Sequence, residues 1–301
     1  MPKNKSVCVL LSSYNGAKFI TTQLDSLLAQ RDVNLKILAR DDGSQDGTCD
    51  ILEKYQQAGQ LNLIRGKNVG YAKSFYLLVK NAPASDYYAY CDQDDFWESD
   101  KLIAAVSMLE DQDQQKPALY FSALKIVDDK LKFKFNSHKN FKLSEHPFQQ
   151  SFIKVAAYGC TLVFNNPARD NLLKYDYDNF YAHDTNLYMT TAALGNLVLD
   201  PLPHIQYRQH AHNIFGYSKL KNKLNYFLNV ECKNMRLKEM QKIKKYFYHQ
   251  LTAQDQNFCD LVCNYKNSPD DKNNLLNYRL LRSGNIIIDS AMRYLIKKEM
   301  F

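Results

Sequence analysis

The chain has 301 residues, of which 45% are hydrophobic, 24% charged and 13% aromatic, with a net charge of +7. This composition suits one large globular domain with a smaller appendage, and it excludes disordered, collagen-like and low-complexity proteins. No apolar run approaches the roughly 18 residues that span a bilayer, and the apolar stretch at 7–11 is too short for a signal peptide. The sequence therefore predicts a cytoplasmic protein.

The positive charge is confined to the C-terminal part of the chain. Residues 217–301 hold sixteen Lys and Arg against eight Asp and Glu, whereas residues 1–216 are close to neutral. A nucleic-acid reader would interleave basic and aromatic residues on its main domain, so we expect no nucleic-acid partner. Seven scattered cysteines without a C-x-x-C pair indicate reduced thiols.

Strand-like and helix-like segments alternate up to about residue 115. The pattern predicts strands at 7–12, 35–39, 61–64 and 87–91, and helices at 16–30, 50–58, 71–80 and 100–110. This alternation is typical of a parallel, doubly wound sheet with its ligand site at the carboxyl ends of the strands. Beyond it we expect strands at 118–127 and 158–164, helices at 167–174 and 184–194, a polar loop at 130–147, and helices from 217 onward.

Polar residues follow each of the four early strands. They are Ser12–Gly16, Asp41–Ser44, Asn68–Gly70 and Asp92–Asp95, in chain order. Because the carboxyl ends of parallel strands meet at one edge, we expect these four segments to line one crevice.

Asp92, Asp94 and Asp95 place three carboxylates within four residues. Like charges this close raise one another's pKa, so a cation would stabilise them, and oxygen-rich sites suit Mg²⁺ or Mn²⁺. An isolated D-x-D is more often a solvated turn before a helix. Its position after a buried strand favours the metal site instead.

Asp41 and Asp42 end the second apolar strand. A helix cap needs only one such side chain, so two aspartates at this point favour a ligand, such as the imide N–H of a uracil or thymine ring. The chain has neither a G-x-G-x-x-G after its first strand nor a G-x-x-x-x-G-K-[ST] loop. A bound metal would therefore have to neutralise a diphosphate.

Seven motifs occur in a recognisable order along residues 6–216. They are Ser13-Tyr14-Asn15-Gly16, Asp41–Thr48, Asn68-Val69-Gly70, Asp92–Trp97 with Lys101, Gly159-Cys160-Thr161, His183-Asp184 and Tyr207-Arg208-Gln209-His210. Together they resemble family 2 of the inverting glycosyltransferases, in particular the rhamnosyltransferase-like branch that builds bacterial cell-surface polysaccharides.

The resemblance implies an α/β protein with the GT-A fold, in which helices flank a Rossmann-like, mostly parallel sheet. Residues 1–216 would form the glycosyltransferase domain and residues 217–301 a basic helical extension. It also implies a dTDP- or UDP-linked sugar donor, a divalent metal (Mn²⁺ or Mg²⁺) and a glycan acceptor.

The resemblance also assigns roles to single residues of this chain. Ser12 and Asp41 would contact the base and ribose, Asp42 the ribose or diphosphate, and Tyr14 and Asn68 the donor. Asp92 and Asp94 would hold the metal and the donor, Asp184 would be the general base, and Arg208 and His210 would approach the diphosphate or the metal, with His210 as a third metal ligand.

The chemistry agrees with these roles. Displacement of a nucleoside diphosphate builds negative charge on the departing phosphate, which a metal and Arg208 would stabilise. The acceptor hydroxyl must lose a proton, and one carboxylate suffices for that. From the residues alone, Asp184 at a helix start is equally a cap or a base; the resemblance favours the base. Trp97 is either a stacking floor for a sugar or a core residue, and His212 is left unassigned.

For the donor we expect dTDP-rhamnose, with UDP-galactose or UDP-glucose as the alternative. A catalytically silent nucleotide- or carbohydrate-binding module is the alternative outside the enzymes. Processive relatives carry a Q-x-x-R-W segment that is lacking here, which predicts transfer of one or a few sugars.

The segment 219–245 combines lysines with apolar residues at helical spacing. It either packs its apolar stripe on the catalytic domain or makes a peripheral contact with the inner face of the membrane, where polyprenyl-diphosphate-linked acceptors would lie. A homodimer through 275–281 and 286–288 is a third use of the extension.

Overall fold

The structure is a computed structural model that describes residues 5–137, 142–180, 182–210, 230–278 and 286–299. Contacts divide the chain into two compact units. The sheet unit comprises Met1–Lys142, Ala157–Asp184 and Asn196–Tyr217, and the helical unit comprises Leu143–Ala156, Thr185–Gly195 and Ser218–Phe301. The predicted domain boundary after residue 216 stays a prediction.

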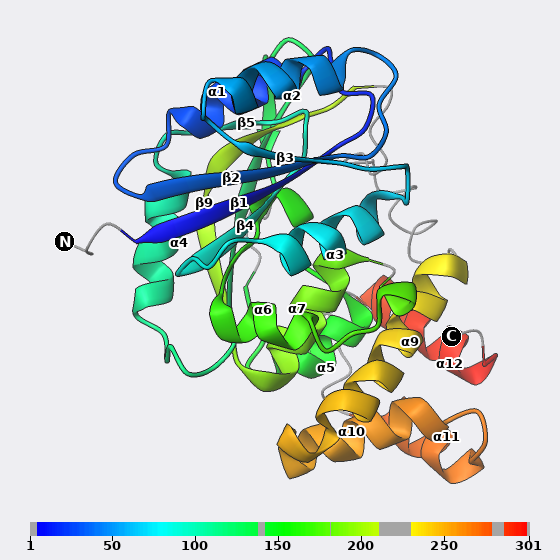
Figure 1. The fold of residues 1–301 in the computed structure, drawn as a ribbon. Coiled ribbons are helices and arrows are strands. Elements are labelled where there is room, and N and C mark those ends of the chain that lie inside the picture. The colour runs from blue at the N-terminus through cyan, green and yellow to red at the C-terminus, as the bar shows by residue number, and fades with distance from the viewer. Residues whose placement is uncertain (1–4, 138–141, 181, 211–229, 279–285, 300–301) are drawn as a thin grey trace. The chain divides into compact units, whose positions relative to one another are not determined.

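Nine strands of the described chain form one mixed sheet (Figure 1), in the order β3-β2-β1-β4-β8-β6-β9-β5 with β7 beside β6. The strands β3, β2, β1 and β4 are parallel, as are β6 and β9, whereas β8, β7 and β5 run antiparallel to their neighbours. Their bounds are β1 (Ser6–Ser13), β2 (Asn34–Asp41), β3 (Asn62–Arg65), β4 (Tyr87–Cys91), β5 (Phe96–Trp97), β6 (Ala118–Val127), β7 (Phe133–Asn136), β8 (Val163–Asn165) and β9 (Asn196–Arg208).

The central strands are continuous apolar runs because helices cover both faces of this part of the sheet. Every residue of β4 is buried, and so are the five residues from Val7 to Leu11 of β1. Helices of the sheet unit are α1 (Ile20–Leu28), α2 (Thr48–Gln57), α3 (Tyr71–Asn81), α4 (Lys101–Glu110) and α6 (Asn166–Leu172), with short 3₁₀ turns η1 (Gly159–Thr161) and η2 (Tyr177–Asn179). The helix α7 (His183–Leu194) begins in the sheet unit and continues in the helical unit.

The helical unit contains α5 (Pro147–Ile153), α9 (Val230–Phe247), the 3₁₀ turn η3 (Tyr248–Gln250), α10 (Ala253–Asn264), α11 (Pro269–Asn277) and α12 (Ile286–Lys297). In α9, Met240, Ile243 and Phe247 are buried at three- and four-residue spacing, and the helix packs against α10 and α5. The described part of the predicted apolar stripe is therefore core of this unit, while residues 220–228 lie outside the description. None of the described helices is long and apolar enough to cross a bilayer.

The strands β5, β7 and β9 and the helix α5 were not predicted from the sequence, and β7 lies within 130–147, which was expected as a polar loop. The segment expected as one strand at 158–164 is instead the turn η1 followed by β8. Strand β9 escapes prediction because Pro201 and Pro203 interrupt it, and these prolines lie where its register with β6 shifts. Prolines are tolerated at such irregularities because a ladder hydrogen bond is already missing there.

Candidate active site

The loops that follow β1, β2 and β4 meet at one edge of the sheet. The Tyr14 N–H donates to Gln93 Oε1 at 2.8 Å, and Gln93 Nε2 donates back to the Tyr14 carbonyl at 3.0 Å. On the other side, the Asn15 N–H donates to Ser44 Oγ at 2.9 Å. Both aspartate segments therefore contact the β1 loop, so these strand ends share an edge; the crevice expected between them stays a prediction.

Asp41 uses its carboxylate to shape the loop after β2. Its oxygens accept hydrogen bonds from the Gly43 N–H at 3.2 Å, the Ser44 N–H at 2.9 Å and the Ser44 hydroxyl at 2.5 Å. The side chain is buried. Asp41 thus holds a tight turn, and its predicted contact with the base and ribose stays a prediction.

Asp42 joins the loop after β2 to the loop after β3. It forms a buried ion pair with Arg40 and accepts hydrogen bonds from the Val69 and Gly70 N–H groups at 3.1 Å. Arg40 also donates to Ser74 Oγ at 3.2 Å. The hydrogen bonds of Asp42 hold the loop after β3 at the same edge, and removal of either ion-pair partner would leave a buried charge.

The remaining predicted donor residues lie on the same loops. Tyr14 is 45% exposed, and Asn68 is exposed while its Oδ1 accepts from the Gly70 N–H at 3.1 Å. Ser12 is half-buried, and its hydroxyl lies 2.6 Å from that of Ser74. Tyr14 and Asn68 therefore present side chains to solvent at this edge, which is what contact with a donor requires.

The end of β9 closes onto the loop between β4 and β5. His210 Nε2 lies 2.8 Å from Asp94 Oδ2, and Arg208 Nε donates to the Asp94 carbonyl at 2.8 Å. The Arg208 backbone N–H donates to Asp95 Oδ1 at 3.0 Å. Segments more than 110 residues apart in sequence thereby join one acidic cluster.

This cluster concentrates negative charge. Burial, followed by the neighbouring carboxylates of Asp94 and Asp184, raises the pKa of Asp92 to about 7. Burial, again followed by neighbouring carboxylates, raises the pKa of Asp95 well above its usual range. A positive charge bound nearby would favour the ionised form of both groups.

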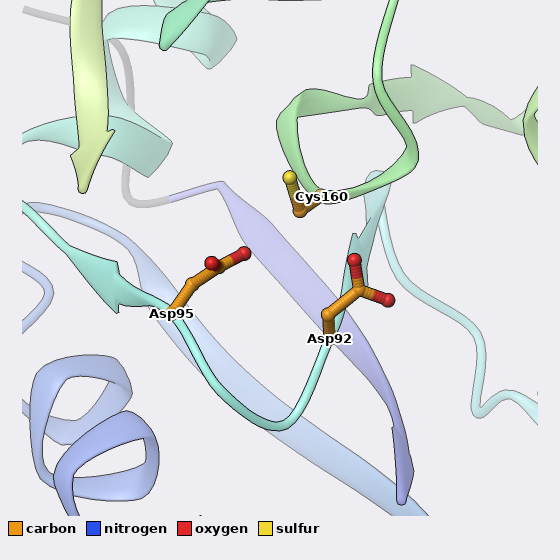
Figure 2. A group of neighbouring side chains, drawn as sticks. All are labelled: Asp92, Asp95 and Cys160. Atoms are coloured by element: carbon orange, nitrogen blue, oxygen red, sulfur yellow. The ribbon is translucent and has the colours of Figure 1, made fainter. Parts of the chain in front are cut away.

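Figure 2 shows Asp92 and Asp95 on the two arms of the β4–β5 loop, with Cys160 of η1 beside them. Their potential ligand atoms lie within 4.8 Å of one another, and no other such group of His, Cys, Asp or Glu occurs in the described ranges. The predicted ligands Asp92, Asp94 and His210 therefore do not gather as closely, although His210 does contact Asp94.

The chemistry of the ligand atoms distinguishes the thiol from the carboxylates. Burial raises the pKa of Cys160 well above its usual value, so its thiol stays protonated and is a poor ligand. Mg²⁺ and Mn²⁺ prefer oxygen ligands, which Asp92, Asp94 and Asp95 all offer, and a bound cation would favour ionisation of Asp92, whose pKa is raised. Asp92 together with Asp94 or Asp95 therefore offers oxygen ligands that fit a divalent cation.

Asp184 belongs to the same electrostatic cluster. It lies in the first turn of α7, is half-buried, and contributes to the raised pKa of both Asp92 and Tyr90. The structure thus brings the predicted base near the predicted metal ligand. Its role in proton transfer stays a prediction.

His183 anchors the start of α7. Its ring stacks on Phe75 with centroids 4.0 Å apart, and a Cβ on Gly159 would lie 2.5 Å from its Nε2. Burial lowers the pKa of His183 to about 4, so the ring is neutral near pH 7. Gly159 and His183 therefore form a close contact immediately before Asp184.

Two contributors were not singled out from the sequence: Gln93 and Arg40. Gln93 stands between two aspartates, and Arg40 is a charge within an apolar strand, which is the one sequence signal for it. Trp97 is 1% exposed, and the Lys101 ammonium lies 3.5 Å from its ring centroid. Trp97 is thus a core residue, as one of the two alternatives predicted, and His212 lies outside the described residues.

The sequence matches the family model "Glycosyl transferase family 2" over residues 8–163, more than half of the chain. The dTDP-rhamnosyl transferase RfbG of Shigella flexneri is 30% identical over 221 residues, which cover 68% of this chain and 73% of that protein. The uncharacterized glycosyltransferase RP339 of Rickettsia prowazekii is 24% identical over 212 residues, covering 68% of this chain and 64% of the relative.

Solved structures share the fold. S. aureus TarS 1–349 in complex with UDP-GlcNAc aligns with a TM-score of 0.54 and 12% identity, over 98% of this chain and 92% of that chain. The mannosyltransferase PcManGT from Pyrobaculum calidifontis, in complex with GDP-Man and Mn²⁺, aligns with a TM-score of 0.50 and 14% identity, over 96% and 86%. The fold is that of a GT-A glycosyltransferase. The chain belongs to glycosyl transferase family 2.

Proposed function

We propose that this glycosyltransferase is metal-dependent, inverting and non-processive, and that it moves L-rhamnose from dTDP-rhamnose to a cell-surface polysaccharide intermediate. The observation that carries the proposal is the cluster of Asp184 with Asp92 and Asp94, at the edge where the predicted donor loops meet. The 30% identity to a dTDP-rhamnosyl transferase supports the choice of donor.

In this proposal the chain's own residues bind the donor and remove one proton. The loops with Ser12, Tyr14, Asp41, Asp42 and Asn68 hold the nucleotide. The acceptor hydroxyl attacks the anomeric carbon from the face opposite the nucleotide, and the Asp184 carboxylate accepts its proton. The Gly159–His183 contact fixes the helix start from which Asp184 acts.

The departing diphosphate needs positive charge. Asp92 and Asp94, with His210 as a further ligand, would hold Mn²⁺ or Mg²⁺, which supplies that charge when bound. Arg208 adds a guanidinium held by the carbonyls of Asp94 and Asp129. A side chain fixed in this way stabilises developing charge without reorganisation during the reaction.

The donor is tested by a hydrolysis screen across dTDP-, UDP- and GDP-linked sugars, with and without Mn²⁺. The proposal expects the fastest turnover with dTDP-rhamnose and a requirement for metal. Preference for UDP-galactose or UDP-glucose would favour the alternative donor. Nucleotide binding without turnover of any donor would identify a silent binding module.

The base is tested by Asp184→Asn. Transfer should fall at least about a hundredfold while nucleotide binding is kept, in line with the contribution of a positioned base. Asp50→Asn is the matched control, since Asp50 also lies in the first turn of a helix and is exposed. Near-normal transfer by Asp184→Asn would reject the assignment.

The acceptor and its location are parts of the same proposal. We propose a polyprenyl-diphosphate-linked glycan, reached by a cytoplasmic enzyme at the inner face of the membrane. Because Met240, Ile243 and Phe247 are buried, a membrane contact of α9 would rest on its lysines. Sedimentation with vesicles containing anionic lipid should then exceed that with neutral vesicles, and equal sedimentation would contradict the contact.

A homodimer through 275–281 and 286–288 also stays a prediction, which the mass in solution tests.

A further inference from the structure

An open groove of about 700 Å³ lies on the sheet unit, and none of the predicted donor, metal or catalytic residues lines it. Its sides carry apolar groups that face solvent. Phe133 of β7 is 54% exposed and Leu202 of β9 is 62% exposed, with Pro203 beside it. The lining also includes the polar residues Arg31, Asp100 and Asn136. Ligand sites commonly combine such apolar faces with a few placed polar groups, and this volume lies in their range.

One lining residue, His204, is buried and hydrogen-bonded through both ring nitrogens. His204 lies between two carboxylates, with Nδ1 3.1 Å from Asp100 Oδ1 and Nε2 3.1 Å from Asp200 Oδ2. Asp200 accepts a further hydrogen bond from the Tyr120 hydroxyl at 2.9 Å. These bonds raise the pKa of His204, so the charged ring is stabilised between its partners. A groove lined by a side chain fixed in this way is preorganised for a ligand.

Glu98 and Lys125, which both line the groove, form an ion pair. Glu98 lies 3.6 Å from Lys125 Nζ and accepts from Gln206 Nε2 at 2.9 Å. The lining cations Arg31, Lys125 and His204 face the lining anions Glu98 and Asp100. This near balance fits a neutral polyol better than a polyanion such as a nucleic acid or an anionic membrane.

The groove begins close to the active-site edge. Val127 of β6 pairs with Phe133 of β7 on one side and with Arg208 of β9 on the other. Since neighbouring strands lie about 4.8 Å apart, the Phe133 and Arg208 backbones are separated by about 10 Å. Phe133 is thus level with the residue that closes onto the acidic cluster.

We propose that this groove binds the non-reacting sugars of the acceptor glycan. A pyranose ring has apolar C–H faces and a rim of hydroxyls, which match the exposed Phe133 and Leu202 faces and the Arg31, Asp100 and Asn136 side chains between them. The inference rests on the proposed transfer to a glycan and deepens it. It makes the enzyme selective for acceptors of several sugars, because a single ring cannot fill the groove and reach the active-site edge.

The test uses the full chain and a panel of neutral oligosaccharides of two to six residues, built from rhamnose, glucose, galactose and N-acetylhexosamine. Binding is measured by saturation-transfer NMR without any donor. The groove variant is the double substitution Phe133→Ser with Leu202→Ser. The matched control is Leu28→Ser with Phe135→Ser, two exposed apolar residues that do not line the groove. Donor hydrolysis is measured on all three proteins.

The groove variant should bind the best oligosaccharide at least about tenfold more weakly than the wild type, the effect expected from removing two anchor side chains. The control should bind like the wild type, and all three should hydrolyse the donor at one rate. Unchanged binding by the groove variant would overturn the inference, as would a wild type that binds no member of the panel.

Two more measurements distinguish a glycan groove from a dimer interface and from a protein without transferase activity. A mass in solution that falls for the groove variant alone would show that a second copy covers this face, and would overturn the inference. Absence of donor hydrolysis in the wild type would count against the proposed function only, because oligosaccharide binding is measured without donor.

Discussion

Two loops at one edge of the sheet carry adjacent aspartates after a buried strand, and the surroundings of these carboxylates differ between the two loops. After β2, Asp41 and Asp42 receive hydrogen bonds from backbone amides, and Asp42 also pairs with Arg40. After β4, Asp92 and Asp95 crowd together and their pKa values are raised. In the first loop, the positive charge of Arg40 pairs with Asp42. In the second loop, a bound cation would favour the ionised forms of Asp92 and Asp95. We infer that the aspartates with protein hydrogen-bond donors hold the shape of the site, and that the closely spaced ones after β4 are available for its chemistry.

The largest expected effect is on the β4 loop. Asp92→Asn should lower transfer by about a thousandfold, since it removes a ligand of the predicted metal and with it the stabilisation of the departing diphosphate. Transfer is measured with saturating donor and Mn²⁺. Asp111→Asn, which changes an exposed aspartate at the end of α4, is the control. Transfer above a tenth of the wild-type rate would remove Asp92 from the reaction.

The β2 loop should respond in stability. Asp42→Asn would leave the buried Arg40 without its ion-pair partner, and the free energy of unfolding should fall by about 3 kcal/mol. Asp41→Asn, which breaks no ion pair, should cost about 1 kcal/mol. Urea unfolding measures both. Equal losses for the two variants would contradict the assignment of Asp42 as the charged link between the loops.

A substitution at Gly159 tests how Asp184 is positioned. Gly159→Ala would place a Cβ 2.5 Å from His183 Nε2, and the ring must then shift beside the predicted base. We expect kcat to fall about tenfold or more, with an unchanged KM for the donor, since small misplacements of a reacting group are costly. An unchanged kcat would show that the His183 contact does not position Asp184.

The smallest expected effect is on stability against pH. The pKa of Asp92 is raised from 3.8 to about 7, so the folded protein holds this proton more tightly than the unfolded chain does. The stability this contributes is full below pH 3.8 and is lost as the pH rises towards 7. Metal-free wild type should therefore lose more stability than Asp92→Asn between pH 4 and pH 7.5, as measured by urea unfolding. Parallel curves would contradict the raised pKa, because the substitution removes the titration of Asp92 and its effect on that of Asp95.

The sequence predicted the regular part of the fold well. The expected strands at 87–91 and 118–127 match β4 and β6 to the residue, because both are apolar runs with clear ends. The expected meeting of the strand ends followed from parallel pairing alone. Strand β9 was missed since its prolines and mixed polarity are tolerated only through pairing with β6, a contact that no local pattern reveals.

The site was predictable in outline and not in detail. Asp94 and His210 were expected together and do contact each other, whereas the closeness of Asp95 and Cys160 to Asp92 depends on η1, which was expected as strand. The backbone partners of Asp42, the Val69 and Gly70 N–H groups, lie 27 and 28 residues away along the chain, so these hydrogen bonds could not be predicted from the sequence. Residue types indicate which chemistry is available, and only the packed loops show which carboxylates are already used.

The most direct test compares melting temperatures with dTDP, Mn²⁺ and both ligands together. A ligand at a hundred times its Kd adds about 2.7 kcal/mol, which raises the melting temperature by several degrees. The wild type should gain more with both ligands than the sum of the separate gains, and Asp92→Asn should lose that excess while it keeps the gain from dTDP alone. An excess of the same size in Asp92→Asn would contradict the account in which the loop after β4 binds the metal and the loop after β2 binds the nucleotide.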